Sequence, residues 1–112
     1  MSDVAQDAVL GIVLNHPGEA ARVFATIPVE AFTGPRTFVA QAIHGLRIRQ
    51  ERVDAFTVSV EMQKRGTLGR AGGGDVVSKL ADGYSILAAL PSYLDVIVRE
   101  MRLRQLEQIT AR

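Results

Sequence analysis

The sequence has 112 residues, of which 47% are hydrophobic, and its 13 Lys and Arg against 12 Asp and Glu leave a net charge of +1. This length suffices for one domain with a hydrophobic core and is too short for two. The balanced charge excludes a strong overall field for nucleic acids or membrane surfaces, and the absence of cysteine excludes disulfides and cysteine-ligated zinc. The acidic N-terminus and the lack of an apolar run of ~18 residues indicate a soluble, cytoplasmic protein with no membrane partner.

The first part of the chain predicts two helices and a turn. Apolar residues at helical spacing predict a first helix that Asp3 caps and that Pro17 ends, because proline disfavours helical backbone at the residue before it. A shorter helix is expected over residues 19–26. One further turn over residues 29–32 is expected to bury Phe32.

The middle of the chain predicts two longer helices. Residues 36–50 carry apolar side chains at i, i+3, i+4 and i+7, which is the pattern of an amphipathic helix. The β-branched residues 57–60 also fit a strand, but residues 61–65 continue the segment without a break. We therefore predict a helix here, with Asp54 as its N-cap and Gly66 as its C-terminal cap.

The last part of the chain predicts a glycine-rich turn over residues 69–74, a short helix over residues 75–81 and one long helix. Residues 84–90 fit either a helix or an ordered connection. Beyond its initial proline, the segment 91–112 contains no glycine or proline, which predicts one helix of about 30 Å. With no alternating strand pattern, the fold class is all-α: a compact multi-helix head (residues 1–90) and a long C-terminal helix within one domain.

The apolar residues of this last helix fall on two faces. At ~100° per residue, four of them share one face: Leu94, Ile97, Val98 and Met101. The other three lie about a third of a turn or more around the axis: Leu103, Leu106 and Ile109. We expect the first set to pack on the head and the second to bind a partner outside it.

One spacing is compatible with nucleotide binding. Gly69 and Gly74 are separated as in a phosphate-binding G-x-x-x-x-G loop. Such a loop needs a lysine for the phosphates and a serine or threonine for magnesium, whereas Asp75 and Val76 follow here. Because the acid would repel a nucleotide, we interpret the segment as a turn into a helix.

No arrangement of side chains indicates catalysis, a metal or a cofactor. The two histidines, His16 and His44, lie on different predicted elements, and neither has a carboxylate at the i+4 spacing of a helical metal pair. No serine lies in a nucleophile elbow, and no pair of acids falls on one predicted face inside an apolar pocket. The arginines are interspersed with glutamates and accompanied by few aromatic residues, which favours solvated helix faces over DNA contact. The chain is not predicted to be an enzyme.

The order of these features resembles a known family. Its most distinctive part is the run Ile97-Val98-Arg99-Glu100, preceded by Gly66-Thr67-Leu68 and by Gly72-Gly73. Further matching positions are Gly11 in the first helix, Arg36 and Asp54. On these residues the chain resembles, over nearly its whole length, the N-terminal domain of the DnaB-type bacterial replicative DNA helicase. The resemblance gives the quoted residues a structural role.

The resemblance implies an all-helical head followed by the first helix of a hairpin. It also implies a noncatalytic domain in DNA replication, because the ATP-hydrolysing motor of such helicases lies C-terminal to it. The implied partners include a second copy of the domain, in dimers that form a hexameric collar. The residues expected to bind the second copy or the other hairpin helix are Leu103, Leu106 and Ile109.

The resemblance further implies that the C-terminal domain of primase, or a helicase loader, docks on this domain. The residues expected on the docking surface are Val4, Asp7 and Val76. Val4 stands where the family usually has an acid and Val76 where it usually has an aromatic residue, which affects partner choice or affinity. Strong direct DNA binding and a cofactor are not expected.

An alternative remains open from the sequence. A free-standing small helical factor of a phage or plasmid, acting on a helicase or on DNA, would have the same helical pattern. The last helix reaches Arg112 without a glycine or asparagine stop, so we expect residues 1–112 to be part of a longer protein.

Overall fold

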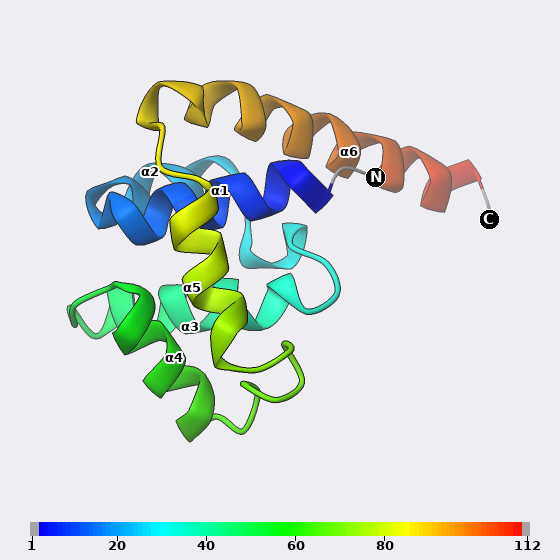
Figure 1. The fold of residues 1–112 in the computed structure, drawn as a ribbon. Coiled ribbons are helices and arrows are strands. Elements are labelled where there is room, and N and C mark those ends of the chain that lie inside the picture. The colour runs from blue at the N-terminus through cyan, green and yellow to red at the C-terminus, as the bar shows by residue number, and fades with distance from the viewer. Residues whose placement is uncertain (1–2, 111–112) are drawn as a thin grey trace.

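The computed structural model describes residues 3–110, and every regular element in that range is helical (Figure 1). The predicted all-α class is confirmed. The longer helices are, in chain order, α1 (Asp3–Asn15), α2 (Ala20–Thr26), α3 (Arg36–Ile48), α4 (Ala55–Lys64), α5 (Gly74–Gly83) and α6 (Leu90–Thr110). Single turns of 3-10 helix link some of them: η1 (Pro17–Glu19), η2 (Val29–Ala31) and η3 (Leu87–Ala89).

Helix α1 is the central helix of the core. Nine of its 13 residues are buried, so it is covered on all sides, as expected for a helix with apolar residues around its circumference. It packs against α5, α6 and α3. In Figure 1, α6 runs along one side of α1, α5 crosses it, and α3 and α4 lie on the side away from α6.

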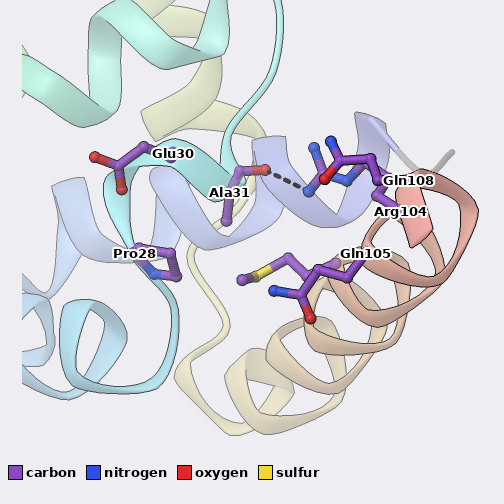
Figure 2. Close-up of a pocket in the computed structure, with 7 residues that line it drawn as sticks. Pro28, Glu30, Ala31, Arg104, Gln105 and Gln108 are labelled. Carbon is purple, nitrogen blue, oxygen red and sulfur yellow. Dashed lines mark hydrogen bonds between the residues drawn. The ribbon is translucent and has the colours of Figure 1, made fainter. Parts of the chain in front are cut away.

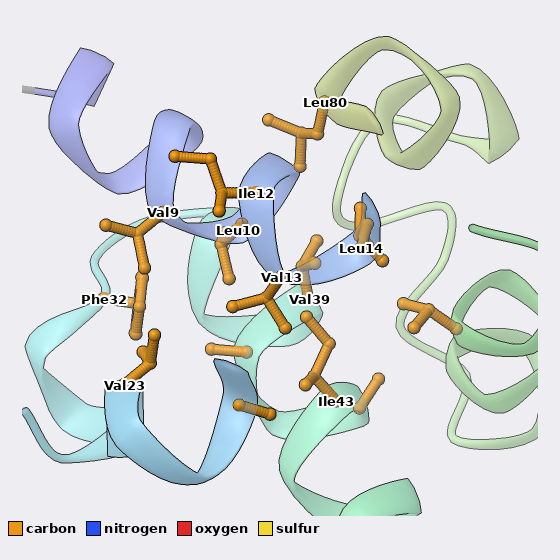
Figure 3. Close-up of a cluster of buried hydrophobic side chains, with 14 of the residues drawn as sticks. Val9, Leu10, Ile12, Val13, Leu14, Val23, Phe32, Val39, Ile43 and Leu80 are labelled. Atoms are coloured by element: carbon orange, nitrogen blue, oxygen red, sulfur yellow. The ribbon is translucent and has the colours of Figure 1, made fainter. Parts of the chain in front are cut away.

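The core joins side chains from most helices of the head. Figure 3 shows Val13 of α1, Val23 of α2, Ile43 of α3 and Leu80 of α5 in one buried cluster. Phe32, which follows η2, belongs to the same cluster and is only 3% exposed, which confirms the predicted buried turn. Burial of apolar side chains of this size is the main favourable contribution to folding.

Two close contacts fix the crossing of α1 and α5. Gly11 faces the backbone of α5, and a Cβ atom at this position would clash with the Leu80 carbonyl oxygen and the Tyr84 Cβ. The Asn15 Nδ2 at the end of α1 donates to the carbonyl oxygens of Ala81 (2.7 Å) and Tyr84 (3.0 Å). Glycine at position 11 therefore allows the two helices to approach, and Asn15 joins their ends.

Helix α4 begins and ends as the sequence predicts. The Asp54 carboxylate accepts from the Thr57 N–H (2.8 Å) while the Asp54 N–H donates to the Thr57 hydroxyl (2.9 Å), which is a capping box. The Thr57 backbone bond lowers the pKa of Asp54. At the other end Gly66 has φ of 72° and its N–H donates to the Gln63 carbonyl oxygen at 3.1 Å. The helical interpretation of residues 57–65 is confirmed.

The structure differs from the sequence predictions at some helix ends. Asp3 is the first described residue and already belongs to α1, so the predicted cap at Asp3 stays a prediction. The third helix ends at Ile48 rather than residue 50, because Gln50 adopts a left-handed φ of 58° that turns the chain towards α4. Residues 84–86 form a connection, and α6 begins one residue before Pro91. Arg112 lies outside the described residues.

Candidate functional site

The two faces of α6 have different surroundings. Leu94 and Ile97 are buried against the head, with Val98 and Met101 half-buried beside them, as predicted. Three large apolar side chains further along are instead 58–70% exposed. We call this surface the α6 outer face, and it consists of Leu103, Leu106 and Ile109.

The inner side of the same part of α6 does contact the head. The Arg104 Nη2 donates to the Ala31 carbonyl oxygen of η2 at 3.3 Å (Figure 2). A groove of about 290 Å³ runs beside this contact, lined by Pro28, Glu30, Ala31, Met101, Arg104, Gln105 and Gln108. The second half of α6 is therefore held by a polar contact that the sequence analysis missed, and this contact directs the outer face away from the head.

A second candidate surface is a hollow between α1, α3 and α5. It measures about 290 Å³ and is lined by Asp7, Pro35, Arg36, Val39, Ala71, Val76, Lys79 and Leu80. Of the residues predicted for partner docking, Asp7 and Val76 thus line one hollow. Val4 is 55% exposed on α1 and lies outside the lining of this hollow. The structure brings together two of the three predicted residues.

An ion pair forms one wall of this hollow. The Arg36 Nε donates to the Asp7 Oδ1 at 2.6 Å and its Nη2 to the Asp7 Oδ2 at 3.3 Å, while the Asp3 carboxylate lies 3.8 Å from Arg36 Nη1. The hydrogen bond to Asp7 raises the pKa of Arg36. Two parallel hydrogen bonds fix the orientation of both groups, so Asp7 presents a rigid polar edge to the hollow.

The paired glycines directly follow Ala71, which lines this hollow. Gly72 and Gly73 have φ values of 114° and 96°, which L side chains rarely adopt. A Cβ at Gly72 would lie 2.7 Å from the Val76 Cγ2. These glycines allow the loop to turn tightly against the first turn of α5.

The remaining residues of the resemblance lie on α6. Arg99 is exposed and Glu100 is half-buried. Their structural role stays a prediction.

A buried carboxylate links α3 to α4. Glu61 is 7% exposed, and its two oxygens accept from the Arg49 Nη2 (2.7 Å) and the Arg65 Nε (2.8 Å). The hydrogen bonds from Arg49 and then Arg65 lower the pKa of Glu61 to about 2. Glu61 and Arg65 have the i, i+4 spacing of a helical ion pair, which the sequence could have shown. The Arg49 contact depends on the chain reversal at Gln50 and had no sequence signal.

The histidines do not form a site. The His16 Nε2 lies 3.0 Å from the Ser85 carbonyl oxygen, and the His44 ring packs edge-on against Phe24 with centroids 5.4 Å apart. Within residues 3–110, no group of three or more His, Cys, Asp and Glu side chains is placed to hold a metal ion. In the same range, no helix is long and apolar enough to cross a membrane.

The fold defines an all-α domain with a helical head and a long, partly exposed last helix. Residues 2–100 match the family model described as "DnaB-like helicase N terminal domain". The chain therefore belongs to the DnaB-like helicase N-terminal domain family, the noncatalytic part of a replicative helicase. The resemblance drawn from the sequence is confirmed.

The structure is similar to the crystal structure of the N-terminal domain of DnaB helicase from Mycobacterium tuberculosis. The TM-score is 0.92 at 28% sequence identity, and the match covers 99% of this chain and 80% of that chain. A comparison with curated proteins gave no match.

Proposed function

We propose that this chain is an assembly and docking domain of a replicative DNA helicase. Copies of the domain associate through the α6 outer face, as dimers within a hexameric collar of the full helicase. The head presents a surface to the C-terminal domain of primase or to a helicase loader. The observation that carries this proposal is the exposure of Leu103, Leu106 and Ile109 on one side of a helix in a member of this family.

The energetics of the outer face support a weak association. Fully burying one Leu or Ile side chain contributes about 1.5–3 kcal/mol to the free energy of association. A two-fold symmetric contact would bury the α6 outer face of both copies. Loss of translational and rotational freedom on association costs about 4–15 kcal/mol. Because these terms are comparable, we expect the isolated chain to self-associate weakly.

Sedimentation equilibrium tests the association. The average mass of the wild-type chain should rise with concentration, and Leu106→Glu should suppress this rise because a carboxylate would be buried in the contact. Ile86→Glu is a matched control, since Ile86 is 69% exposed in the connection that precedes η3 and α6. A wild-type chain that stays strictly monomeric at the highest attainable concentration would contradict dimerisation through this face.

The docking part of the proposal is supported by the shared hollow of Asp7 and Val76. Titration with the cognate primase C-terminal domain or loader, followed by calorimetry, should show binding that Val76→Asp weakens. The exposed Ser78 lies on the same helix outside the hollow lining, so Ser78→Asp should leave the affinity unchanged. Absence of binding to both proteins, or equal effects of the two variants, would remove this part of the proposal.

A further inference from the structure

Another exposed apolar surface lies on α4, on the side of the head away from α6 (Figure 1). Phe56, Val60 and Lys64 are spaced four residues apart and therefore share one face of this helix. Phe56 is 75% exposed, the largest exposed fraction among the large hydrophobic side chains of the described residues. Helix α4 packs against α3 and α5, so this surface is separate from the α6 outer face.

A small hollow adjoins Phe56. It measures about 170 Å³ and is lined by Leu46, Glu51, Arg52, Phe56, Thr57, Val60, Glu61 and Lys64. Sites for small molecules usually measure about 300–1,000 Å³, so this hollow fits a single side chain better than a free ligand. Its apolar part is formed by Leu46, Val60 and the Phe56 ring.

The lining holds two cations, Arg52 and Lys64, and two acids, Glu51 and Glu61, within a segment that is more basic than the whole chain. Residues 47–65 contain five Lys and Arg against three Asp and Glu, compared with 13 against 12 in the whole sequence. Both Glu61 oxygens are paired with arginines, and Glu51 is paired with Arg49 at 3.1 Å. Lys64 is exposed and forms no ion pair within residues 3–110.

Arg52 supplies a second exposed cation at the hollow. Its side chain is 83% exposed while its Nε contacts the Asp54 carboxylate at 2.7 Å. Ion pairs this exposed contribute little to stability, so Arg52 can exchange Asp54 for a carboxylate of a partner at little cost.

We propose that this hollow binds a short acidic segment of a partner protein. One large apolar side chain of the segment enters between Phe56 and Val60, and a carboxylate beside it pairs with Lys64 or Arg52. The apolar contact supplies most of the affinity, because exposed aromatic residues in such hollows act as anchors of protein interfaces. The cations select an acidic segment over a basic one.

A single-stranded nucleic acid fits this surface less well. Strand binding relies on several aromatic side chains that stack on successive bases, whereas Phe56 is the one aromatic residue in the lining.

The test is a titration of the ¹⁵N-labelled chain with each of two synthetic peptides. Binding is followed by the chemical shifts of the backbone amides. One peptide carries Glu residues around one Leu and one Phe, and in the other Lys replaces each Glu. The acidic peptide should give saturable shifts centred on Phe56, Val60 and Lys64. The basic peptide should bind at least about tenfold more weakly, equivalent to a loss of ~1.4 kcal/mol.

Variants at exposed positions of this surface separate a loss of peptide binding from a loss of folding. Phe56→Ser and Lys64→Glu alter exposed side chains, so circular dichroism should show a folded chain, and each should weaken the acidic peptide about five- to tenfold. Leu103→Ser is the matched control, because it removes an exposed apolar side chain from the α6 outer face and should leave peptide affinity unchanged.

Three results would overturn the inference: no saturable shifts with the acidic peptide, equal affinity for both peptides, or shifts centred away from α4. Displacement of the peptide by oligo-dT from the same residues would instead identify a nucleic-acid site. None of these results bears on the association of α6, which the Leu106→Glu variant reports separately.

Discussion

Helices α1 and α6 are both rich in apolar residues but bury them differently. In α1 the apolar side chains surround the helix, and nine residues are buried by elements on all sides. In α6 the apolar side chains change face along the helix, so Leu94 and Ile97 are buried whereas Leu103 and Ile109 are exposed. Apolar content alone thus does not tell which residues stabilise the head. The angular position of each side chain decides it.

The largest expected effect is a difference in the free energy of unfolding between substitutions of two isoleucines, one in α1 and one in α6. Ile12 of α1 is 1% exposed and Ile109 of α6 is 70% exposed. Ile12→Ala should lower the free energy of unfolding by about 2–5 kcal/mol because it leaves a cavity in the core. Ile109→Ala should change it by no more than about 0.5 kcal/mol. Urea unfolding of both variants at low protein concentration measures the difference, and similar losses of stability would show that Ile109 also contributes to the core.

The next effect concerns the tight contact of α1. Gly11→Ala should destabilise the chain by about 1–3 kcal/mol, because the added methyl group meets the α5 backbone and outweighs the better helix propensity of alanine. Gly18→Ala is the control, since a Cβ there meets no atom within 4 Å. Thermal unfolding compares the two. A Gly11→Ala variant as stable as wild type would show that α5 can shift without cost.

A smaller effect is expected from the polar contact of α6. Arg104→Ala removes the hydrogen bond to the Ala31 carbonyl oxygen and should cost about 0.5–1.5 kcal/mol. The neighbouring Arg102 is exposed, so Arg102→Ala serves as the control with little expected change. Hydrogen exchange of the α6 amides should rise in the Arg104 variant only. Equal exchange in both variants would mean that Arg104 does not hold the second half of α6.

The smallest change is expected from acid. In the folded chain the pKa of Glu61 lies at about 2, below the ~4.3 of an unfolded chain, so its contribution is complete above pH ~5 and is lost as the pH falls towards 2. Its arginine partners are 42% and 36% exposed, which limits the effect. Urea unfolding between pH 6 and 3 should therefore show a slope that Glu61→Gln reduces. An unchanged slope would assign the acid dependence to other carboxylates.

Local signals in the sequence were sufficient for the existence of the helices and for both ends of α4. Asp54 and Thr57 cap α4 through atoms three residues apart, and Gly66 ends it through its own φ, so neither needs distant contacts. The two faces of α6 follow from spacing alone. The family could likewise be recognised from short runs of residues.

The side chains that join distant segments could not be predicted in this way. Arg36 contacts Asp7 across 29 positions, and Arg104 contacts Ala31 across 73. The position of Asp7 and Val76 at one hollow, with Val4 outside its lining, also depends on how α1, α3 and α5 pack. These contacts follow from the relative placement of helices, which periodicity along one helix does not determine.

The most direct test of the α6 outer face uses the absence of cysteine from the chain. Leu106→Cys places one thiol on the outer face, and Ile86→Cys places one in the connection before η3 and α6, where the side chain is comparably exposed. A disulfide needs Cα atoms about 4.4–6.8 Å apart, so oxidation reports which face copies share. Association through the α6 outer face predicts a covalent dimer for Leu106→Cys and mostly monomer for Ile86→Cys. Equal yields of dimer from the two variants would contradict it.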